Sequence, residues 1–448
     1  TYMLDKLEIP DLTILDDRKF FQKILPGYLE NKGGLSELYQ RTIRPAYLYW
    51  DKVKFQQLPE GVTHFEFWRL VKFIRKAQAM KTVVRAENGN FFTWVRLSGL
   101  EEFFHEIDLN TGGNLFGFIG DMNEKNRYKF ISRGIMEEAI ASAQLEGAAT
   151  TRAVAKRFLR EGRKPMNKSE QMILNNYKSI QAIESEYKDK NLTLDILFEL
   201  HAMITERTVN EEERGRLRKN EENIVVANSY GSIVHNPPQV EFVKEELERL
   251  IQFANNELGE PFLHPIIKAI IVHFWIGYLH PFTDGNGRLA RLMFYWYLLK
   301  ENYWAFAYLP ISKIIKKSPV QYADAYVYSE QDDLDLTYFI DYNIQKIKMA
   351  VKEFEAYLEE RARQNSSMNK LAKAKYQFND RQIQLLQYFF KNKDERTSLK
   401  IHTGINQISK KTAWTDIREL ERNGFIKAEK IKKNVYYYGT DKVGQLFR

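Results

Sequence analysis

The chain has 448 residues, of which 44% are hydrophobic and 28% charged, and its formal net charge is +8. This length predicts two to four domains with packed cores. The absence of cysteine excludes disulfides, cysteine nucleophiles, zinc fingers and iron–sulfur clusters. The longest apolar stretch, Ala269–Leu279, is too short to cross a bilayer, and no signal-like segment opens the chain. We therefore expect a cytoplasmic protein that has no membrane partner.

The positive charge is concentrated at the C-terminal end. Residues 365–448 contain 18 Lys and Arg against 8 Asp and Glu, whereas the preceding residues contain 49 against 51. This asymmetry favours an anionic partner for the C-terminal region, and a solvated basic surface is the alternative.

Residues 1–122 form a predicted N-terminal accessory region of mixed α and β structure. Apolar spacing predicts an amphipathic helix over 62–79. Asn88-Gly89 between two β-rich runs, 83–85 and 91–95, predicts a hairpin. We find no chemical motif here, so packing, positioning or recognition is the expected role.

Residues 123–363 read as a mainly helical domain. Apolar residues recur at steps of three and four, and they predict helices over 129–148, 168–188, 192–206, 240–256, 265–280 and 336–363. Residues 222–238 interrupt this pattern with β-branched residues around a turn, which predicts a short hairpin. The polar stretch that follows, with boundaries at 364–376, is predicted to be a linker.

Residues 377–448 form a predicted third domain. Three short helices (380–390, 398–403 and 409–423) precede two strands (425–431 and 435–438), which a basic turn connects. This order is typical of a winged helix-turn-helix domain, whose third helix contacts DNA bases while its wing contacts phosphates. The predicted fold class is therefore mainly α, with small β elements in each part.

One string carries the strongest chemical signal: His280-Pro281-Phe282-Thr283-Asp284-Gly285-Asn286-Gly287-Arg288-Leu289-Ala290-Arg291. An apolar helix delivers His280, and Pro281 ends that helix. Gly-Asn-Gly lets backbone N–H groups converge on phosphate oxygens at the start of the next helix. Two arginines at a three-residue step can reach the same polyphosphate, and a carboxylate beside it suits Mg²⁺. The histidine is the nearby group that can accept a proton at neutral pH.

This string resembles the signature of the Fic family, His-Pro-Phe-x-(Asp/Glu)-Gly-Asn-Gly-Arg-x-x-Arg, without departures. Fic domains are helical and typically transfer AMP from ATP to a protein hydroxyl. The resemblance implies that His280 deprotonates the target, that Asp284 holds Mg²⁺ and that the backbone of 285–287 cradles the phosphates. It also implies that Arg288 and Arg291 bind the phosphates that leave as pyrophosphate.

The resemblance assigns two further features. The predicted hairpin over 224–235, which we call the flap, matches the segment that aligns the target in this family, and Val234 and His235 are its candidate target contacts. Tyr322 lies where the family has an adenine contact, so it is a candidate nucleotide-binding residue.

A second motif, Ser142-Ala143-Gln144-Leu145-Glu146-Gly147, lies on the helix predicted over 129–148. It resembles the (Ser/Thr)-x-x-x-Glu-(Gly/Asn) inhibitory motif that precedes the core in one class of Fic proteins. The resemblance implies that Glu146, with Ser142, inhibits the enzyme. A bidentate pair between Glu146 and Arg291 would occupy the donor that the γ-phosphate needs.

The C-terminal domain leaves two alternatives open. Lys410, Lys411, Thr412, Thr415 and Arg418 lie on or next to the expected recognition helix, and Lys430, Lys432 and Lys433 lie in the expected wing. Double-stranded DNA is one predicted partner. Docking of a protein, or formation of a homodimer, is the other.

Together these features predict an autoinhibited protein adenylyltransferase that uses ATP and Mg²⁺. Its predicted partner is a protein with a Tyr, Thr or Ser hydroxyl, which includes the chain itself. The alternative is a DNA-binding regulator whose Fic site senses ATP or transfers a different nucleotide or phosphate. The phosphate-binding string does not contact the nucleotide base, so it does not specify which nucleotide is used.

Overall fold

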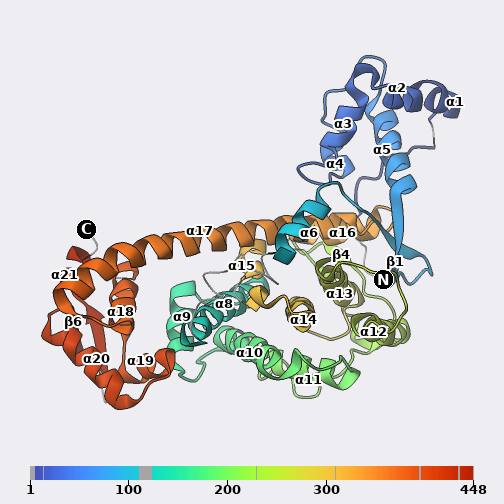
Figure 1. Ribbon diagram of the computed structural model, residues 1–448. Coiled ribbons are helices and arrows are strands. Elements are labelled where there is room, and N and C mark those ends of the chain that lie inside the picture. Colours follow the sequence, from blue (N-terminus) through green and yellow to red (C-terminus); the bar gives the residue numbers. More distant parts are fainter. Residues whose placement is uncertain are drawn as a thin grey trace.

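The computed structural model describes residues 6–13, 15–109, 124–228, 230–307, 309–392, 395–431 and 434–446, without side chains at 124–131, 358–359, 361–375 and 391. Helices dominate these residues, so the predicted mainly helical class is confirmed. The strands form two separate hairpins and one three-stranded sheet of order β5-β7-β6. Figure 1 shows an N-terminal group of helices that projects from the central helices, and a C-terminal group at the opposite end.

The N-terminal elements are α1 (Asp17–Lys19), α2 (Leu25–Leu29), α3 (Leu35–Arg41), α4 (Trp50–Val53), α5 (His64–Gln78), β1 (Ala79–Arg85), β2 (Phe91–Val95) and α6 (Leu100–Asp108). The predicted amphipathic helix is confirmed as α5. A capping box begins this helix, in which the side chains of Thr63 and Glu66 each accept from the other's backbone N–H. The predicted hairpin is confirmed as β1 and β2. Hydrogen bonds between Thr93 and the segment that begins α17 (Thr337–Tyr376) connect β2 to the central domain.

The central elements are α8 (Glu124–Leu145), α9 (Arg152–Glu161), α10 (Lys168–Ala182), α11 (Leu194–Ile204), β3 (Val226–Ala227), β4 (Ile233–His235), α12 (Val240–Ala254), α13 (Pro265–Leu279), α14 (Asn286–Lys300), α15 (Ile311–Ile315), α16 (Pro319–Gln331) and α17. Nearly every residue of α13 and α14 is buried, because these two helices are apolar around most of their circumference. They lie at the centre of the domain, and the loop 280–285 connects them. The flap is confirmed as a hairpin, β3 and β4.

Two of the predicted boundaries that were wrong concern the linker and Glu146. The helix expected to end at Arg363 continues to Tyr376, so the predicted linker 364–376 is the end of α17. The segment 361–376 is polar but contains neither Gly nor Pro, so nothing in it ends a helix. The helix predicted over 129–148 ends at Leu145, and Glu146 therefore lies in the turn after α8. The division into domains stays a prediction.

The C-terminal elements are α18 (Asp380–Lys391), β5 (Arg396–Thr397), α19 (Leu399–Asn406), α20 (Lys410–Arg422), β6 (Ile426–Ile431), β7 (Asn434–Gly439) and α21 (Asp441–Gln445). The three helices and two strands predicted here are confirmed, and Asn379 caps α18 as its side chain accepts from the N–H groups of Arg381 and Gln382. The short strand β5 was not predicted. Lys432 and Lys433, expected in the wing, lie outside the described residues.

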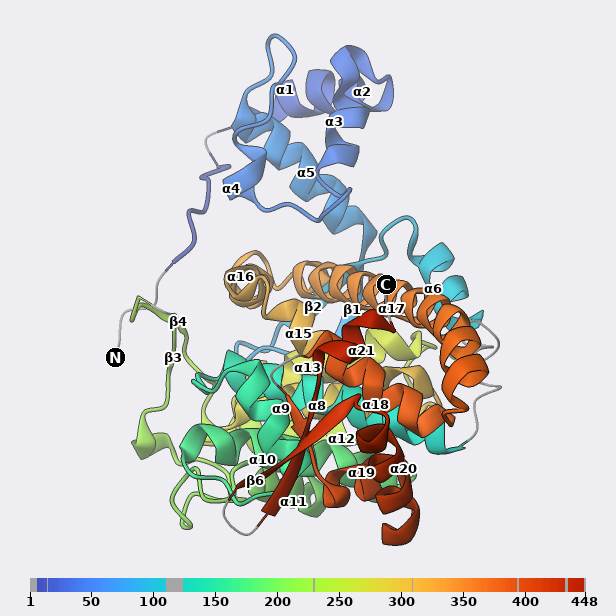
Figure 2. The same cartoon turned by 90° about the vertical axis from the view of Figure 1, so that its left-hand side faces the viewer.

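The C-terminal elements pack against α9, as both views show (Figures 1 and 2). The Arg396 guanidinium donates to Glu161 at 2.7 Å, and Arg160 lies over the Tyr388 ring, 4.6 Å from its centre. The helix α17 connects the central elements to the C-terminal elements along the chain. The contact with α9 is a second connection between these two groups. Among the described residues, no helix has the length and apolar character that a membrane span requires.

Candidate active site

The loop between α13 and α14 has a fixed, unusual backbone. His280 ends α13 in the left-handed region, with φ of +45°, although it is not glycine. Gly285 precedes α14 with φ of +86°, where a side chain would be strained and would meet Thr205. The Asn286 side chain accepts from Phe282 N at 3.0 Å and donates to Phe282 O at 2.8 Å. Phe282 is fully buried, so it anchors the loop in the core as its position in the motif implied.

The first turn of α14 presents backbone donors. Leu289 N donates to Gly285 O at 2.9 Å, which is the first helical hydrogen bond. The N–H groups of residues 286–288 therefore precede the hydrogen-bonded ladder of α14. The positive end of the helix dipole adds to their attraction for an anion. This end of α14 is suited to bind phosphate oxygens.

His280 is held in its neutral form. Burial lowers the pKa of its imidazole to about 3, and the positive charges of His235 and Arg218 act in the same direction, while the Gly277 carbonyl and Asp284 oppose them. A neutral imidazole can accept a proton from a hydroxyl at physiological pH. An anionic triphosphate beside it would raise this pKa and strengthen the base.

The two arginines of the motif lie close together but have different surroundings. The Arg288 guanidinium is almost fully buried, donates to Ile204 O at 2.8 Å and lies 3.4 Å from Asp284 Oδ1. Arg291 is directed toward the turn that follows α8. Both side chains line one small cavity together with Ser142 and Tyr295. The structure thus brings the two guanidinium groups to the same side of α14.

Glu146 reaches Arg291 as the inhibitory motif implied, but through a single oxygen. Arg291 donates from Nη2 to Glu146 Oε1 at 2.8 Å and to Ser142 O at 3.0 Å, and from Nε to Ser142 Oγ at 2.9 Å. The expected bidentate pair is therefore wrong, since one Glu146 oxygen shares Nη2 with Ser142 O and Ser142 Oγ accepts from Nε. The Glu146 carboxylate also lies against Gly287, where a Cβ atom would collide with Oε1. It thus occupies the position at the start of α14 that suits a phosphate.

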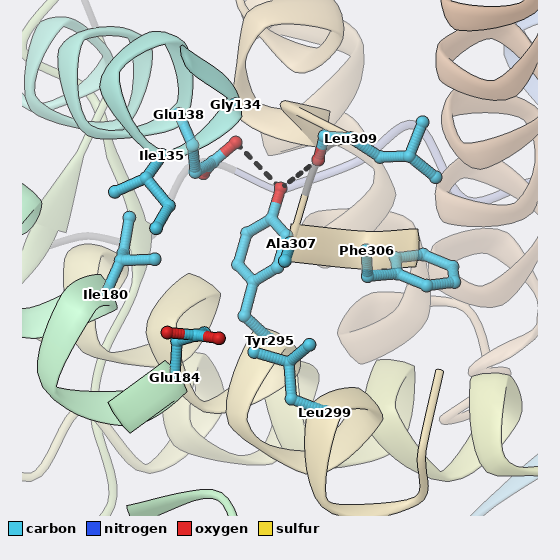
Figure 3. A pocket seen from close by; sticks show the side chains of 10 residues that line it. All are labelled: Gly134, Ile135, Glu138, Ile180, Glu184, Tyr295, Leu299, Phe306, Ala307 and Leu309. Atoms are coloured by element: carbon cyan, nitrogen blue, oxygen red, sulfur yellow. Dashed lines mark hydrogen bonds between the residues drawn. The ribbon is translucent and has the colours of Figure 1, made fainter. Parts of the chain in front are cut away.

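A second carboxylate anchors α8 to the core. Glu138 is buried and accepts from the Tyr295 hydroxyl at 2.7 Å and from Ser312 N at 2.8 Å. Figure 3 shows its carboxylate directed toward the Tyr295 hydroxyl across a pocket between α8 and α14. These contacts fix the position of α8 along α14. They therefore help to place Glu146 against Gly287.

Asp284 is the candidate magnesium ligand. Its carboxylate is 46% exposed, and Gly285 N and Arg288 both contact the same oxygen, Oδ1. The described residues contain no cluster of three or more His, Asp or Glu side chains that could hold a metal. Mg²⁺ is commonly bound by one or two carboxylates together with substrate phosphates and water, so this single accessible carboxylate fits such a site.

The remaining predicted site residues are Tyr322, Val234 and His235. The Tyr322 hydroxyl is 2.7 Å from His273 Nε2. Burial raises the pKa of this hydroxyl, and the nearby Arg291 guanidinium acts in the opposite direction. Val234 is half-buried on β4. His235 is only 7% exposed, and both of its ring nitrogens are engaged by other residues. Contact of His235 with a target therefore stays a prediction.

Two residues that position the loop escaped sequence analysis. His201 on α11 is fully buried, stacks on Phe282 at 3.7 Å and lies 2.9 Å from Asp284 O through Nε2, while its Nδ1 accepts from Gly215 N. Arg218 donates from Nε to His280 O at 2.8 Å. Neither belongs to a local motif, since both reach the loop from distant parts of the chain.

Comparison with known proteins agrees with this site. The family model described as "Fic/DOC family" matches residues 191–298. The chain is 32% identical over 119 residues to a protein named Protein adenylyltransferase Fic from Nematostella vectensis, which covers 26% of this chain and 25% of that protein. It is 36% identical over 67 residues to Protein adenylyltransferase fic-1 from Caenorhabditis elegans, which covers 15% of this chain and 13% of that protein.

A solved structure of a Fic family protein from Desulfovibrio desulfuricans G20 aligns with 77% of this chain and 97% of its own, at 18% identity and a TM-score of 0.49. The chain spans a quarter or less of the length of the two curated relatives named above. The segment that the family model matches, 191–298, contains the loop 280–285 and both motif arginines. Residues 191–298 thus match the Fic/DOC family, and the two curated relatives named above are protein adenylyltransferases.

Proposed function

We propose that the chain is an autoinhibited protein adenylyltransferase, which transfers AMP from ATP to a Tyr, Thr or Ser hydroxyl of a protein, including itself. The observation that carries this proposal is the geometry of one loop. A neutral His280 ends α13, and the start of α14 offers backbone donors and Arg291 to an anion. A proton acceptor beside a polyphosphate site is what nucleotidyl transfer to an alcohol requires.

His280 would accept the proton of the target hydroxyl as its oxygen bonds to the α-phosphorus of ATP. The bond from that phosphorus to the oxygen bridging to the β-phosphate breaks, and pyrophosphate leaves. The N–H groups of 286–288 and the Arg291 guanidinium would stabilise the negative charge on the departing phosphates. Arg288, being buried against Ile204 O, would act mainly by holding the loop and its charge in place.

Magnesium would be held by Asp284, and it would neutralise charge on the triphosphate when bound. The role of Asp284 in the chain itself is to keep the loop closed, since its Oδ1 accepts from Gly285 N at 2.5 Å. His201 would stabilise the same turn through its hydrogen bond to the Asp284 carbonyl.

Inhibition would result from competition for Arg291 and for the space above Gly287. The Glu146 carboxylate is near both, and Glu138 holds its helix against the core. A γ-phosphate that requires the same guanidinium must displace this carboxylate. ATP would therefore bind weakly, or in a pose unsuited to transfer, until Glu146 moves.

Mass spectrometry of the intact chain tests the proposed reaction. We expect the Glu146→Gly variant, incubated with ATP and Mg²⁺, to gain the mass of one or more AMP groups, whereas GTP, CTP and UTP give no gain. A gain from another nucleotide, or of a phosphate alone, would identify a different transferred group. If neither the variant itself nor any added protein gains mass with any nucleotide, the site is a sensor and the proposal is wrong.

We further propose that the C-terminal elements form a winged helix-turn-helix domain that binds double-stranded DNA. The observation that favours this is an exposed basic surface on α20, made by Lys410, Lys411, Arg418 and Arg422. Trp414 is 48% exposed on the same helix, and Arg418 covers its ring. Asp416 does not oppose these charges, because it is buried and paired with Arg381, and Glu421 is an exposed acidic residue of the same helix.

We expect the full chain to bind a double-stranded DNA fragment with an affinity that falls steeply as salt increases, because binding releases counterions. Lys411→Ala and Arg418→Ala should each weaken binding and reduce the slope of log K against log salt by about 1. Lys244→Ala, at an exposed lysine of α12, is the matched control and should have no effect. Gel shifts at several salt concentrations measure this. The absence of any salt-dependent shift would instead favour a protein partner.

A further inference from the structure

The flap has little structure of its own to hold it in place. Its strands pair irregularly, Val226 with His235 and Ala227 with Ile233. Tyr230, in the turn between them, is 90% exposed. Short two-stranded hairpins are marginally stable by themselves. The position of the flap must therefore depend on contacts made at its ends.

The strongest such contact is His235, at the end of β4. Its Nδ1 lies 2.7 Å from Glu330 Oε2 on α16, and its Nε2 lies 2.8 Å from the Tyr278 carbonyl on α13. Tyr278 is in the last turn before His280. One buried side chain thus connects the flap both to the helix that delivers the proposed base and to the helix that carries Tyr322.

The hydrogen-bond geometry specifies the charge of this histidine. A carbonyl oxygen and an ionised carboxylate can only accept, so both ring nitrogens must carry hydrogen. An imidazole with two N–H groups is a cation. We infer that His235 is a positioning residue, which as an imidazolium fixes the flap against α13 and α16 and so aligns a target hydroxyl with His280; this inference rests on the proposed function.

The surrounding charges agree with that state. Burial acts to lower the pKa of His235, but the Glu330 charge, the hydrogen bond to Glu330 and the Tyr278 carbonyl raise it above the usual value. Arg218 faces the ring and acts in the opposite direction, and the ring in turn lowers the pKa of His280. Tyr278 packs beside the imidazole at 5.6 Å. The net effect is a raised pKa, which favours the charged form of His235.

The two hydrogen bonds of His235 depend on pH. Because the pKa in the folded chain is raised, the two hydrogen bonds are complete below the ordinary histidine pKa and are lost as pH rises through the raised value. A neutral imidazole keeps one N–H group, so either Glu330 or the Tyr278 carbonyl loses its donor. The flap should then open more often.

Hydrogen–deuterium exchange of the flap in the full chain tests this inference. We expect Glu330→Gln to speed the exchange of amides 226–235 by about tenfold, since it removes a charged hydrogen bond. In the wild type, exchange corrected for its intrinsic rate should increase from pH 6.5 to pH 9, and the variant should lose this dependence. Asp324→Asn, six residues earlier on the same helix, is the matched control and should behave as wild type. Flap exchange that is independent of pH in the wild type would overturn the inference, even if Glu330→Gln did not fold.

A second measurement separates positioning from general support. In the Glu146→Gly background, Glu330→Gln should reduce AMP transfer to protein while leaving the dissociation constant of ATP, measured by calorimetry, unchanged. Equal loss of ATP binding would mean that Glu330 merely maintains the fold, which contradicts the inference. If Glu146→Gly alone transfers no AMP, the proposed function fails, whereas flap exchange still reports on His235.

Discussion

Replacing Glu146 with glycine is expected to increase AMP transfer by about tenfold or more. The carboxylate forms a charge-assisted hydrogen bond with Arg291 at 2.8 Å, and bonds of this kind contribute about 1.5–3 kcal/mol. Since about 1.4 kcal/mol corresponds to a factor of ten, freeing the guanidinium should increase productive ATP binding by about one to two orders of magnitude. Incorporation of label from ATP labelled at the α-phosphate measures the change.

The comparison variants separate charge from general loosening. Glu146→Gln keeps the shape of the side chain and removes its charge, so we expect it to be activated less than Glu146→Gly. Ser142→Ala removes the 2.9 Å contact to Arg291 Nε but leaves the carboxylate, and should be activated only slightly. Glu186→Gln alters an exposed carboxylate and serves as the matched control. Transfer by Glu146→Gly at the wild-type rate would rule out the inhibitory role.

Replacing His280 with alanine should reduce transfer by about 10²–10⁴-fold, the usual contribution of a general base. The test is made in the Glu146→Gly background, so that inhibition does not conceal the loss. ATP binding should persist, because the phosphate donors belong to α14 and not to His280. His105→Ala, at an exposed histidine of α6, is the matched control. Retained transfer by the His280→Ala double variant would exclude this histidine as the base.

The same residue has a pH signature. A general base loses activity as pH falls through its pKa, and the pKa of His280 is lowered to about 3, chiefly by burial. The profile of kcat/KM for ATP, which reports on the free enzyme, should therefore show no loss from this histidine between pH 5 and 8. A decline near the ordinary histidine pKa would mean that the imidazole is more solvated than the structure has it.

Local patterns predicted most of the helices and the loop, since apolar spacing, Pro281 and the glycines each act on their own neighbours. The proximity of Glu146 to Arg291 came from a family resemblance rather than from spacing. Its detailed geometry was wrong, because Ser142 competes for the same guanidinium. Whether Asp284 and Tyr322 bind their predicted ligands stays a prediction.

The supporting residues could not be predicted, because their roles depend on contacts between distant segments. His201 acts through Asp284, and Glu138 acts through Tyr295 and Ser312. Each is an isolated residue on its helix, where no spacing marks it. The length of α17 was missed for another reason, since polarity was interpreted as a linker although the segment lacks a helix breaker.

Gly287 has a consequence for attempts to engineer this protein. Its missing side chain leaves the room in which the Glu146 carboxylate lies, and a phosphate would need the same room. Under the proposed inhibition, a larger residue here would displace both the Glu146 carboxylate and the phosphate, so restraint and nucleotide use would be lost together. Under the same proposal, a change of the carboxylate, and not of Gly287, is what would separate the two.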